Sequence, residues 1–363
     1  MHALNKIAGM LLLAGALCVP LSAPLEASVT LTDQSGKTVV LPERVERVVA
    51  IPIPLASMVM AIDGGVERLS SINEGARSDI EEGLLGTMFP QARTLSTAVA
   101  GENFVPNSEA LAASRADLVI QWGDRGEAVT EPIRRLGMPV LALRYGDSML
   151  VSDWLRLTGA ALGKGERGQM LAGWFEQGVH AIERRSAAIA PEQRPKVLYL
   201  MRARAGLQVA GKGTSMDADL RRAGGVNPAA ELPGFAPVGI EQILAWNPDV
   251  ILLNNFEPGL SPQTLFEDRR FSGIAALDSR RVYLYPRGGF RWDPPSQETP
   301  LTLDWLFAVL HPERAEPGLR DRVRAAYQLL YGHELNEAEL GQLLRLELNA
   351  AGRNYVELFG AQR

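Results

Sequence analysis

Two similar stretches decide the fold: EALAASRADLVI, residues 109–120, and EQILAWNPDVIL, residues 241–252. Each begins with a glutamate and has apolar residues two and three positions later. Alanine follows at the fourth position, an aspartate at the eighth, and then three apolar residues. This pattern predicts a short helix that ends just before a buried strand. One such unit arises easily by chance, but two in equivalent places indicate a chain built from two similar lobes.

Other short apolar runs alternate with helical patterns in both halves of the chain. The predicted strands are residues 47–51, 117–122, 138–143, 196–201, 249–253 and 281–285. Strands that alternate with helices are typical of βαβ units, which form mainly parallel sheets. We therefore expect an α/β protein with two Rossmann-like lobes.

A long helical segment separates the two sets of strands. Residues 166–189 place apolar side chains on one face at three- and four-residue spacing, and Pro191 and Pro195 end the pattern. As a single helix, this segment would be about 36 Å long. It predicts that one long helix joins the lobes.

The predicted domain boundaries follow from these elements. Residues 28–147 form the N-terminal lobe, residues 148–190 the helical linker, and residues 191–363 the C-terminal lobe with extra terminal helices. Asn336 is the expected N-cap of the last helix.

The first 27 residues have the pattern of a secretory signal peptide. Lys6 precedes an apolar run, residues 7–19, which is too short to span a bilayer, and small residues lead to an expected cleavage site after Ala27. A lipid anchor through Cys18, the only cysteine, stays open. The predicted location of the mature chain is the periplasm.

Composition and motifs exclude several classes of function. The 363 residues carry a net charge of −5 without a basic stripe, which argues against nucleic-acid binding. No glycine-rich dinucleotide motif, nucleophile elbow or catalytic triad is visible, so we expect no enzyme and no cofactor. The four histidines form no cluster with metal-ligand spacing. A metal, if one is bound, would arrive already chelated.

The order of these motifs resembles the helical-backbone class of periplasmic binding proteins, which serve ABC importers of ferric siderophores, haem and vitamin B12. The resemblance spans the mature chain. It includes the opening TLTDQSGKTVVLP at residues 30–42, the two glutamate-to-aspartate stretches, and AGGVN at residues 223–227. The ending YQLLYGHEL, residues 327–335, is similar to a subgroup with extra C-terminal helices.

The resemblance implies a role for one glutamate on each lobe. In that family a surface glutamate of each lobe docks onto arginines of the membrane permease, and Glu109 and Glu241 match those positions. A carboxylate can accept a bidentate contact from arginine. A structural alternative is that each glutamate only stabilises the first turn of its helix through the helix dipole.

A ligand is expected between the lobes, where the loops that follow the parallel strands face one another. These loops include residues 52–57, 122–125, 144–145, 202–204, 254–256 and 287–292. Arginine forks suit carboxylates and other oxyanions, and aromatic rings can cover an apolar ligand body. The candidate ligand-binding residues are Trp122, Tyr145, Arg202, Arg204, Arg287, Phe290, Arg291 and Trp292.

The sequence therefore predicts an extracytoplasmic, monomeric binding protein that delivers an iron chelate, of siderophore or haem type, to the permease dimer of an ABC importer. Two alternatives stay open. One is a cobalamin or an oxyanion such as molybdate bound by the same fold. The other is an exported α/β hydrolytic enzyme.

Overall fold

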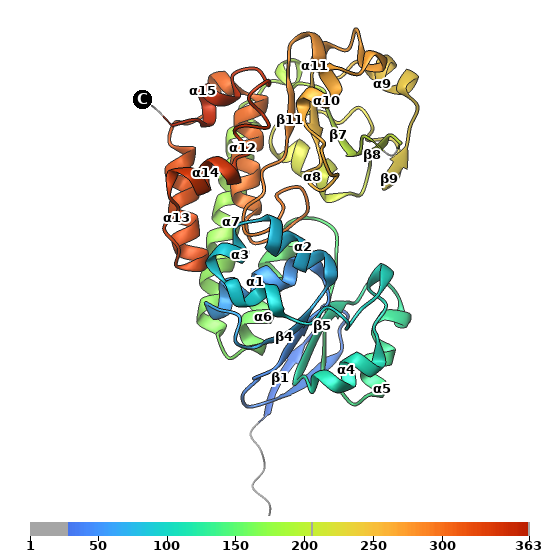
Figure 1. Cartoon of the computed structure of the whole chain (residues 1–363), viewed down its shortest axis with the longest axis vertical. Coiled ribbons are helices and arrows are strands. Elements are labelled where there is room, and N and C mark those ends of the chain that lie inside the picture. Colours follow the sequence, from blue (N-terminus) through green and yellow to red (C-terminus); the bar gives the residue numbers. More distant parts are fainter. Residues whose placement is uncertain (1–27, 205, 362–363) are drawn as a thin grey trace, which may run out of the picture.

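The computed structural model describes residues 28–204 and 206–361, arranged as two lobes connected by helices (Figure 1). The predicted signal peptide and Cys18 lie outside the described residues. Within them, none of the helices combines the length and the apolar character needed to cross a membrane.

The N-terminal lobe contains a hairpin and a four-stranded parallel sheet of order β4-β3-β5-β6. Its elements are β1 (Ser28–Thr32), β2 (Thr38–Pro42), β3 (Val48–Ala50), α1 (Ile53–Asp63), β4 (Leu69–Ile72), α2 (Glu74–Glu82), α3 (Leu85–Met88), α4 (Ser108–Ser114), β5 (Leu118–Trp122), α5 (Glu131–Arg135) and β6 (Val140–Leu143).

The C-terminal lobe has a separate five-stranded sheet of order β11-β10-β7-β8-β9. β7, β10 and β11 run parallel, whereas β8 and β9 are antiparallel additions. The elements are β7 (Val197–Arg202), β8 (Gln208–Ala210), α8 (Ser215–Arg222), β9 (Phe235–Pro237), α9 (Ile240–Trp246), β10 (Val250–Leu253), α10 (Pro262–Phe266), α11 (Ala275–Asp278) and β11 (Val282–Leu284). Two mainly parallel sheets in two lobes confirm the predicted fold class.

The two similar stretches adopt the same local structure. α4 ends at Arg115 and α9 ends at Asn247, both in the left-handed conformation, with φ of 48° and 46°. The aspartate that follows each helix then accepts backbone N–H groups from the start of the neighbouring strand. Asp117 accepts from Glu46 and Arg47 at 2.8 and 2.9 Å, and Asp249 accepts from Lys196 at 2.8 Å. The eighth-position aspartate thus ties each helix–strand unit to its sheet.

Two helices, α6 (Leu150–Ala161) and α7 (Gly165–Ala187), join the lobes. α7 is the predicted long helix. At 23 residues, α7 is about 35 Å long. Gly159 and Gly168 let these helices touch, because a Cβ on Gly159 would lie 2.7 Å from the Gly168 Cα. Gly178 of α7 similarly leaves room for the Pro300 ring.

The C-terminal segment adds α12 (Thr299–Leu310), α13 (Leu319–Tyr331), α14 (Glu337–Leu343) and α15 (Tyr355–Phe359). They stand beside α7 along one side of the molecule (Figure 1). Asn336 is an N-cap as predicted and forms a capping box at the start of α14, but α14 is not the last helix, because α15 follows it.

Arg167 at the start of α7 links the terminal helices to the N-terminal lobe. Its guanidinium donates to the carbonyl of Ala61 in α1 at 3.0 Å and to those of Leu329 and Leu330 in α13 at 2.5 and 3.2 Å. These carbonyls lie in the last turns of α1 and α13, where such groups lack helical partners. The N-terminal lobe, the long helix and the terminal helices are therefore connected at one residue.

Candidate functional site

A cavity of about 230 Å³ lies between the lobes, at the carboxyl ends of strands from both sheets. The N-terminal lobe contributes residues that follow β3, end β5 or follow β6, and the C-terminal lobe contributes from β7, α8, β9 and two loops. The lining residues are Ile53, Pro54, Phe104, Trp122, Arg125, Tyr145, Tyr199, Met201, Met216, Phe235, Phe256, Phe290, Arg291, Asp293 and Pro294.

Aromatic side chains form the N-terminal wall of the cavity. The Trp122 ring packs edge-on against Phe104 and Tyr145, at centroid distances of 6.5 and 5.5 Å, and tilts against Trp154 at 5.2 Å. Such pairs hold each ring in a fixed orientation. The Trp122 side chain is 2% exposed, and its Nε1–H has no partner among the described residues. A donor is thus held at the cavity wall without an acceptor.

Arg125 supplies a positive charge at the rim of the same wall. Its guanidinium lies over the rings of Phe104 and Tyr145, 4.7 and 5.9 Å from their centroids. Within the described chain no carboxylate forms an ion pair with it. The cation is exposed and available to an anion in the cavity.

The C-terminal wall carries charges of both signs. Asp293 is 4% exposed, and one carboxylate oxygen accepts the Tyr199 hydroxyl at 2.8 Å while the other has no partner among the described residues. Burial raises the pKa of the Asp293 carboxyl, and the nearby Arg291 guanidinium opposes that rise. Arg291 also stacks over Phe256 and Phe290, at 4.9 and 5.5 Å.

Ion pairs beneath the cavity connect the lobes. The Asp79 carboxylate of α2 forms an ion pair with the Arg287 guanidinium at 2.7 Å and lies 3.2 Å from the Arg291 Nε. Arg287 also forms an ion pair with Glu82. Burial raises the pKa of Asp79, although both arginines act against this. The Leu84 N–H donates across the same junction to the Gly288 carbonyl at 3.2 Å.

Four of the eight predicted ligand-binding residues line the cavity: Trp122, Tyr145, Phe290 and Arg291. Arg287 does not, because it is buried in ion pairs with the other lobe. Trp292 turns away from the cavity and donates to Glu298 at 2.8 Å. The neighbouring residues Phe290, Arg291, Asp293 and Pro294 line the cavity, and Trp292 is the member of this loop segment that does not.

The remaining two arginines lie outside the cavity lining. Arg202 stacks on the outer side of the site, 4.8 Å from the centroid of Phe256. Arg204 is exposed and donates to the Pro258 carbonyl at 2.9 Å.

Several lining residues were not among the predicted ones. Arg125 and Phe256 belong to loops that the strand pattern had identified. Tyr199 and Met201 lie within β7, whose alternation places them on the side of the cavity. Asp293 lies just beyond the loop that had been considered.

The Trp292–Glu298 contact supports the loop that carries Arg291 and Asp293. Glu298 is fully buried and also accepts the hydroxyls of Tyr327 and Tyr331 of α13, at 2.8 and 2.6 Å. α13 thereby holds one wall of the cavity in place, which gives the terminal helices a role in shaping the site.

Glu109 and Glu241 are both exposed and occupy the second position of α4 and α9. The two helices lie on different lobes, at opposite ends of the molecule (Figure 1). Neither glutamate lines the cavity between the lobes.

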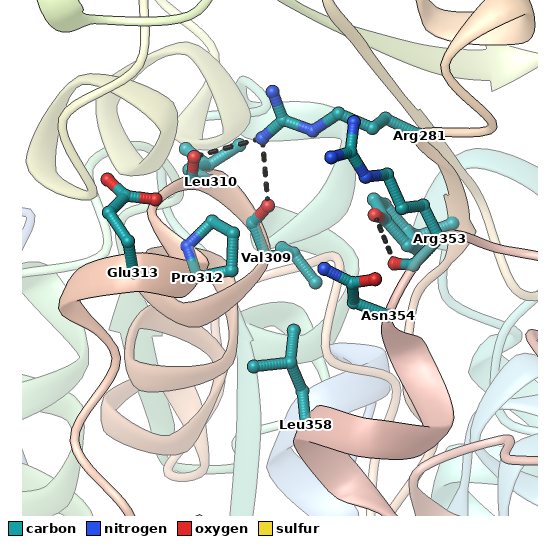
Figure 2. Close-up of a pocket in the computed structure, with 9 residues that line it drawn as sticks. Arg281, Val309, Leu310, Pro312, Glu313, Arg353, Asn354 and Leu358 are labelled. Atoms are coloured by element: carbon teal, nitrogen blue, oxygen red, sulfur yellow. Dashed lines mark hydrogen bonds between the residues drawn. The ribbon is translucent and has the colours of Figure 1, made fainter.

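A second cavity, of about 210 Å³, lies far from the cleft between β11, the end of α12 and α15 (Figure 2). Arg281 donates there to the carbonyls of Val309 and Leu310 at 3.1 and 2.9 Å, so its guanidinium caps α12. The Tyr283 hydroxyl donates to the Arg353 carbonyl at 2.9 Å. These contacts give the second cavity a role in packing the terminal helices.

Comparison with known proteins shows which families and structures this chain is similar to. The family described as "Periplasmic binding protein" matches residues 91–287, more than half of the chain. A periplasmic solute-binding protein from Veillonella parvula is 29% identical, with a TM-score of 0.82, over 89% of this chain and 99% of that one. An ABC transporter solute-binding protein from Sulfurospirillum deleyianum is 28% identical, with a TM-score of 0.73, over 87% and 99%.

A curated relative is the molybdate-binding protein MolA of Haemophilus influenzae. It is 25% identical over 322 residues, which cover 83% of this chain and 90% of the relative. Its molybdate-bound structure has a TM-score of 0.75 and covers 85% of this chain and 99% of that one. These matches confirm the prediction of a binding component rather than an enzyme. The chain belongs to the periplasmic binding protein family, as a solute-binding protein of an ABC importer.

Proposed function

We propose that this protein captures a small anionic metal chelate, such as an iron chelate, in the periplasm and delivers it to an ABC importer. The observation that carries this proposal is the composition of the cavity. Its walls are mainly aromatic rings and methionine side chains, and a single unpaired guanidinium, that of Arg125, stands at the rim. Such a surface suits a ligand with an apolar organic body and a negative charge.

A bare metal ion fits the cavity poorly. The described residues contain no group of three or more histidine, cysteine, aspartate or glutamate side chains able to hold a metal. Asp293, the carboxylate in the cavity wall, accepts a hydrogen bond from the Tyr199 hydroxyl and lies beside Arg291. A metal would therefore be carried by its own organic ligand.

The cavity volume constrains the size of that chelate. Sites for drug-sized ligands usually measure about 300–1,000 Å³, and this cavity, at about 230 Å³, lies below that range. A compact chelate is enclosed more completely than a macrocycle such as haem, which would extend out of the cleft. This favours the siderophore type of the predicted ligand, in a small form.

The proposal is tested by identifying what the purified protein holds. Native mass spectrometry, metal analysis and a visible spectrum distinguish a ferric chelate, haem, cobalamin and a metal oxyanion. Titration with small ferric chelates should then quench the fluorescence of Trp122. We expect Arg125→Gln to weaken binding of anionic chelates about tenfold, the loss of one charged contact. The control Arg135→Gln removes an exposed arginine from α5 and should bind normally.

An oxyanion such as molybdate is the second candidate, favoured by the likeness to a molybdate-binding relative over 83% of the chain. Arg125 and Arg291 would be its cationic partners. A stoichiometric content of molybdenum without an organic ligand, together with tight molybdate binding, would replace the chelate proposal with this one.

We also propose that Glu109 and Glu241 dock the protein onto the permease. Both carboxylates are exposed and occupy equivalent positions on the two lobes. The body between them contains the long helix α7, which keeps their separation nearly constant. Two fixed carboxylates suit a dimeric permease that presents one arginine site for each lobe.

A further inference from the structure

We infer that the cleft distinguishes the two ends of its ligand. Asp293 on the C-terminal wall would accept a hydrogen bond from an N–H or O–H of the ligand, while Trp122 and Arg125 on the N-terminal wall would take its anionic or acceptor end. This inference rests on the proposed function, because it takes the cavity between the lobes to be the ligand site. It adds a chemical requirement: the chelate carries a hydrogen-bond donor that its metal does not use.

The first observation is the free oxygen of Asp293. The side chain is 4% exposed and lines the cavity, and the Tyr199 hydroxyl occupies only one of its two oxygens. The other oxygen has no partner among the described residues. A buried acceptor without a partner is costly, so a ligand that supplies a donor at this point gains affinity from it.

The second observation is the charge balance around Asp293. Arg291 approaches Asp79 at 3.2 Å, and Arg287 also binds Asp79, at 2.7 Å. Two buried aspartates and the exposed Glu82 therefore outnumber the two arginines on this side of the site. No surplus positive charge is left there to attract the anionic end of a ligand, and the free carboxylate oxygen repels it.

The third observation is the opposite polarity of the other wall. The Trp122 Nε1–H is a donor without an acceptor in the described structure, and its side chain is 2% exposed. Arg125 adds a cation over the neighbouring rings of Phe104 and Tyr145. The Tyr145 hydroxyl on this wall can donate or accept, and none of the cavity-lining residues of the wall is a carboxylate, so the wall fits the acceptor end of the ligand.

The two walls together disfavour one class of ligand. A fully deprotonated tetrahedral oxyanion such as molybdate has acceptors on every side. It would satisfy Trp122 and Arg125 but bring negative charge to the free oxygen of Asp293. We therefore expect the protein to prefer a ligand with a donor over one without it.

The test compares two chelates that differ in one donor, ferric tris(acetohydroxamate), which has N–H groups, and ferric tris(N-methylacetohydroxamate), which has none. Calorimetry or Trp fluorescence should show that the native protein binds the first at least about tenfold more tightly. Asp293→Asn should abolish this preference and should also strengthen binding of molybdate. The control Asp278→Asn, an exposed aspartate of the same lobe, should keep the preference.

A second variant separates the two ends of the site. Trp122→Phe keeps a ring in the wall but removes its donor, so it should weaken both chelates about equally and leave the preference for the N–H form intact. This measurement does not depend on the stability of the Asp293 variant.

The outcomes distinguish this inference from the proposed function. Equal binding of the two chelates by the native protein, or an unchanged preference in Asp293→Asn, would overturn the role of Asp293 while the chelate proposal stands. Both test chelates are neutral, so tight binding of molybdate without binding of either one would overturn the inference, and the same result with an anionic ferric chelate such as ferric citrate would overturn the proposed function as well.

Discussion

The two lobes share their outer helix–strand unit and differ at the inner ends of their strands. On the outside, α4 and α9 begin with an exposed glutamate at the same position and end in the same left-handed turn. On the inside, β5 leads to Trp122 in the cavity wall. Its counterpart β10 leads to Asn254, whose side chain accepts the N–H groups of Phe256 and Glu257 within its own loop.

This difference separates two demands on the molecule. Two similar outer surfaces would suit a symmetric permease dimer, so the same helix–strand unit can be retained on both lobes. An asymmetric ligand needs two different walls, and here one wall presents Trp122 and Arg125 while the other presents Arg291 and Asp293. The duplication therefore explains the scaffold and would explain the proposed docking positions, but it does not explain the specificity.

The largest expected effect concerns the shared outer surface. The double variant Glu109→Ala/Glu241→Ala should lower import about 100-fold, because each lost carboxylate contact is worth about tenfold. Each single variant should lose about tenfold if the lobes contribute equally. Uptake is measured in vesicles that contain the importer, and ligand affinity is measured separately and should not change.

A charge-matched control for this experiment is Glu127→Ala/Glu267→Ala, which removes one exposed glutamate from each lobe. It should import normally. Normal import by the Glu109/Glu241 double variant would show that the permease does not use these residues.

The next effect concerns the aspartates that tie the units to their sheets. Asp117→Ala should lower the free energy of unfolding by about 2 kcal/mol, and Asp249→Ala by about half as much. The reason is that Asp117 accepts two backbone N–H groups and Asp249 accepts one. Urea denaturation measures both, and equal losses would show that the lobes are more alike than their hydrogen bonds suggest.

The third effect lies where the segment after β6 meets the C-terminal lobe. Asp219 of α8 accepts the Ser148 hydroxyl at 2.7 Å, and burial raises the pKa of Asp219 to about 6. An unfolded chain has an Asp pKa of about 3.9, so between these values the folded state keeps a proton that the unfolded state has lost. This contribution to stability is full below about pH 4 and is lost as the pH rises through 6.

Asp219→Asn removes that dependence. Relative to the native protein, the variant should gain stability between pH 4 and 6.5, by roughly 2 kcal/mol. Denaturation curves at several pH values measure the difference, and parallel pH profiles for the two proteins would contradict the expected role of Asp219.

The smallest effect concerns the caps of the duplicated helices. The Asn107 side chain accepts N–H groups at the start of α4, whereas Gly239 leaves α9 without a side-chain cap. Asn107→Ala should cost about 1 kcal/mol, and Gly239→Asn should add a few tenths. Thermal unfolding measures both, and a stabilising Asn107→Ala would be inconsistent with this capping.

The sequence predicted the elements that repeat and those with a clear period. Six of the parallel strands, the long helix and the duplicated units follow from apolar patterns that bury one face, whereas β4, β8 and β9 were not predicted. Trp122 and Tyr145 were predicted to line the cleft because they lie at or near strand ends, where the topology itself sets the position.

The loops were less predictable, because no period indicates which side chain turns inward. Arg287 was expected to bind ligand, yet it pairs with Asp79, 208 positions away in the chain. The orientation of Trp292 likewise depends on Glu298, which is held by hydroxyl groups of α13. Contacts between distant segments decide both placements, and a single sequence does not reveal them.

Arg167 at the start of α7 connects α1 of the N-terminal lobe to α13 of the terminal helices. This connection would limit how far the lobes can spread by thermal motion, and a captured ligand would then leave slowly. Unloading would then require the importer to separate the two lobes, through the docking surfaces proposed above. The direction of transport would thus be set by the membrane partner, and the binding protein would act as a cargo holder that cannot easily release its load alone.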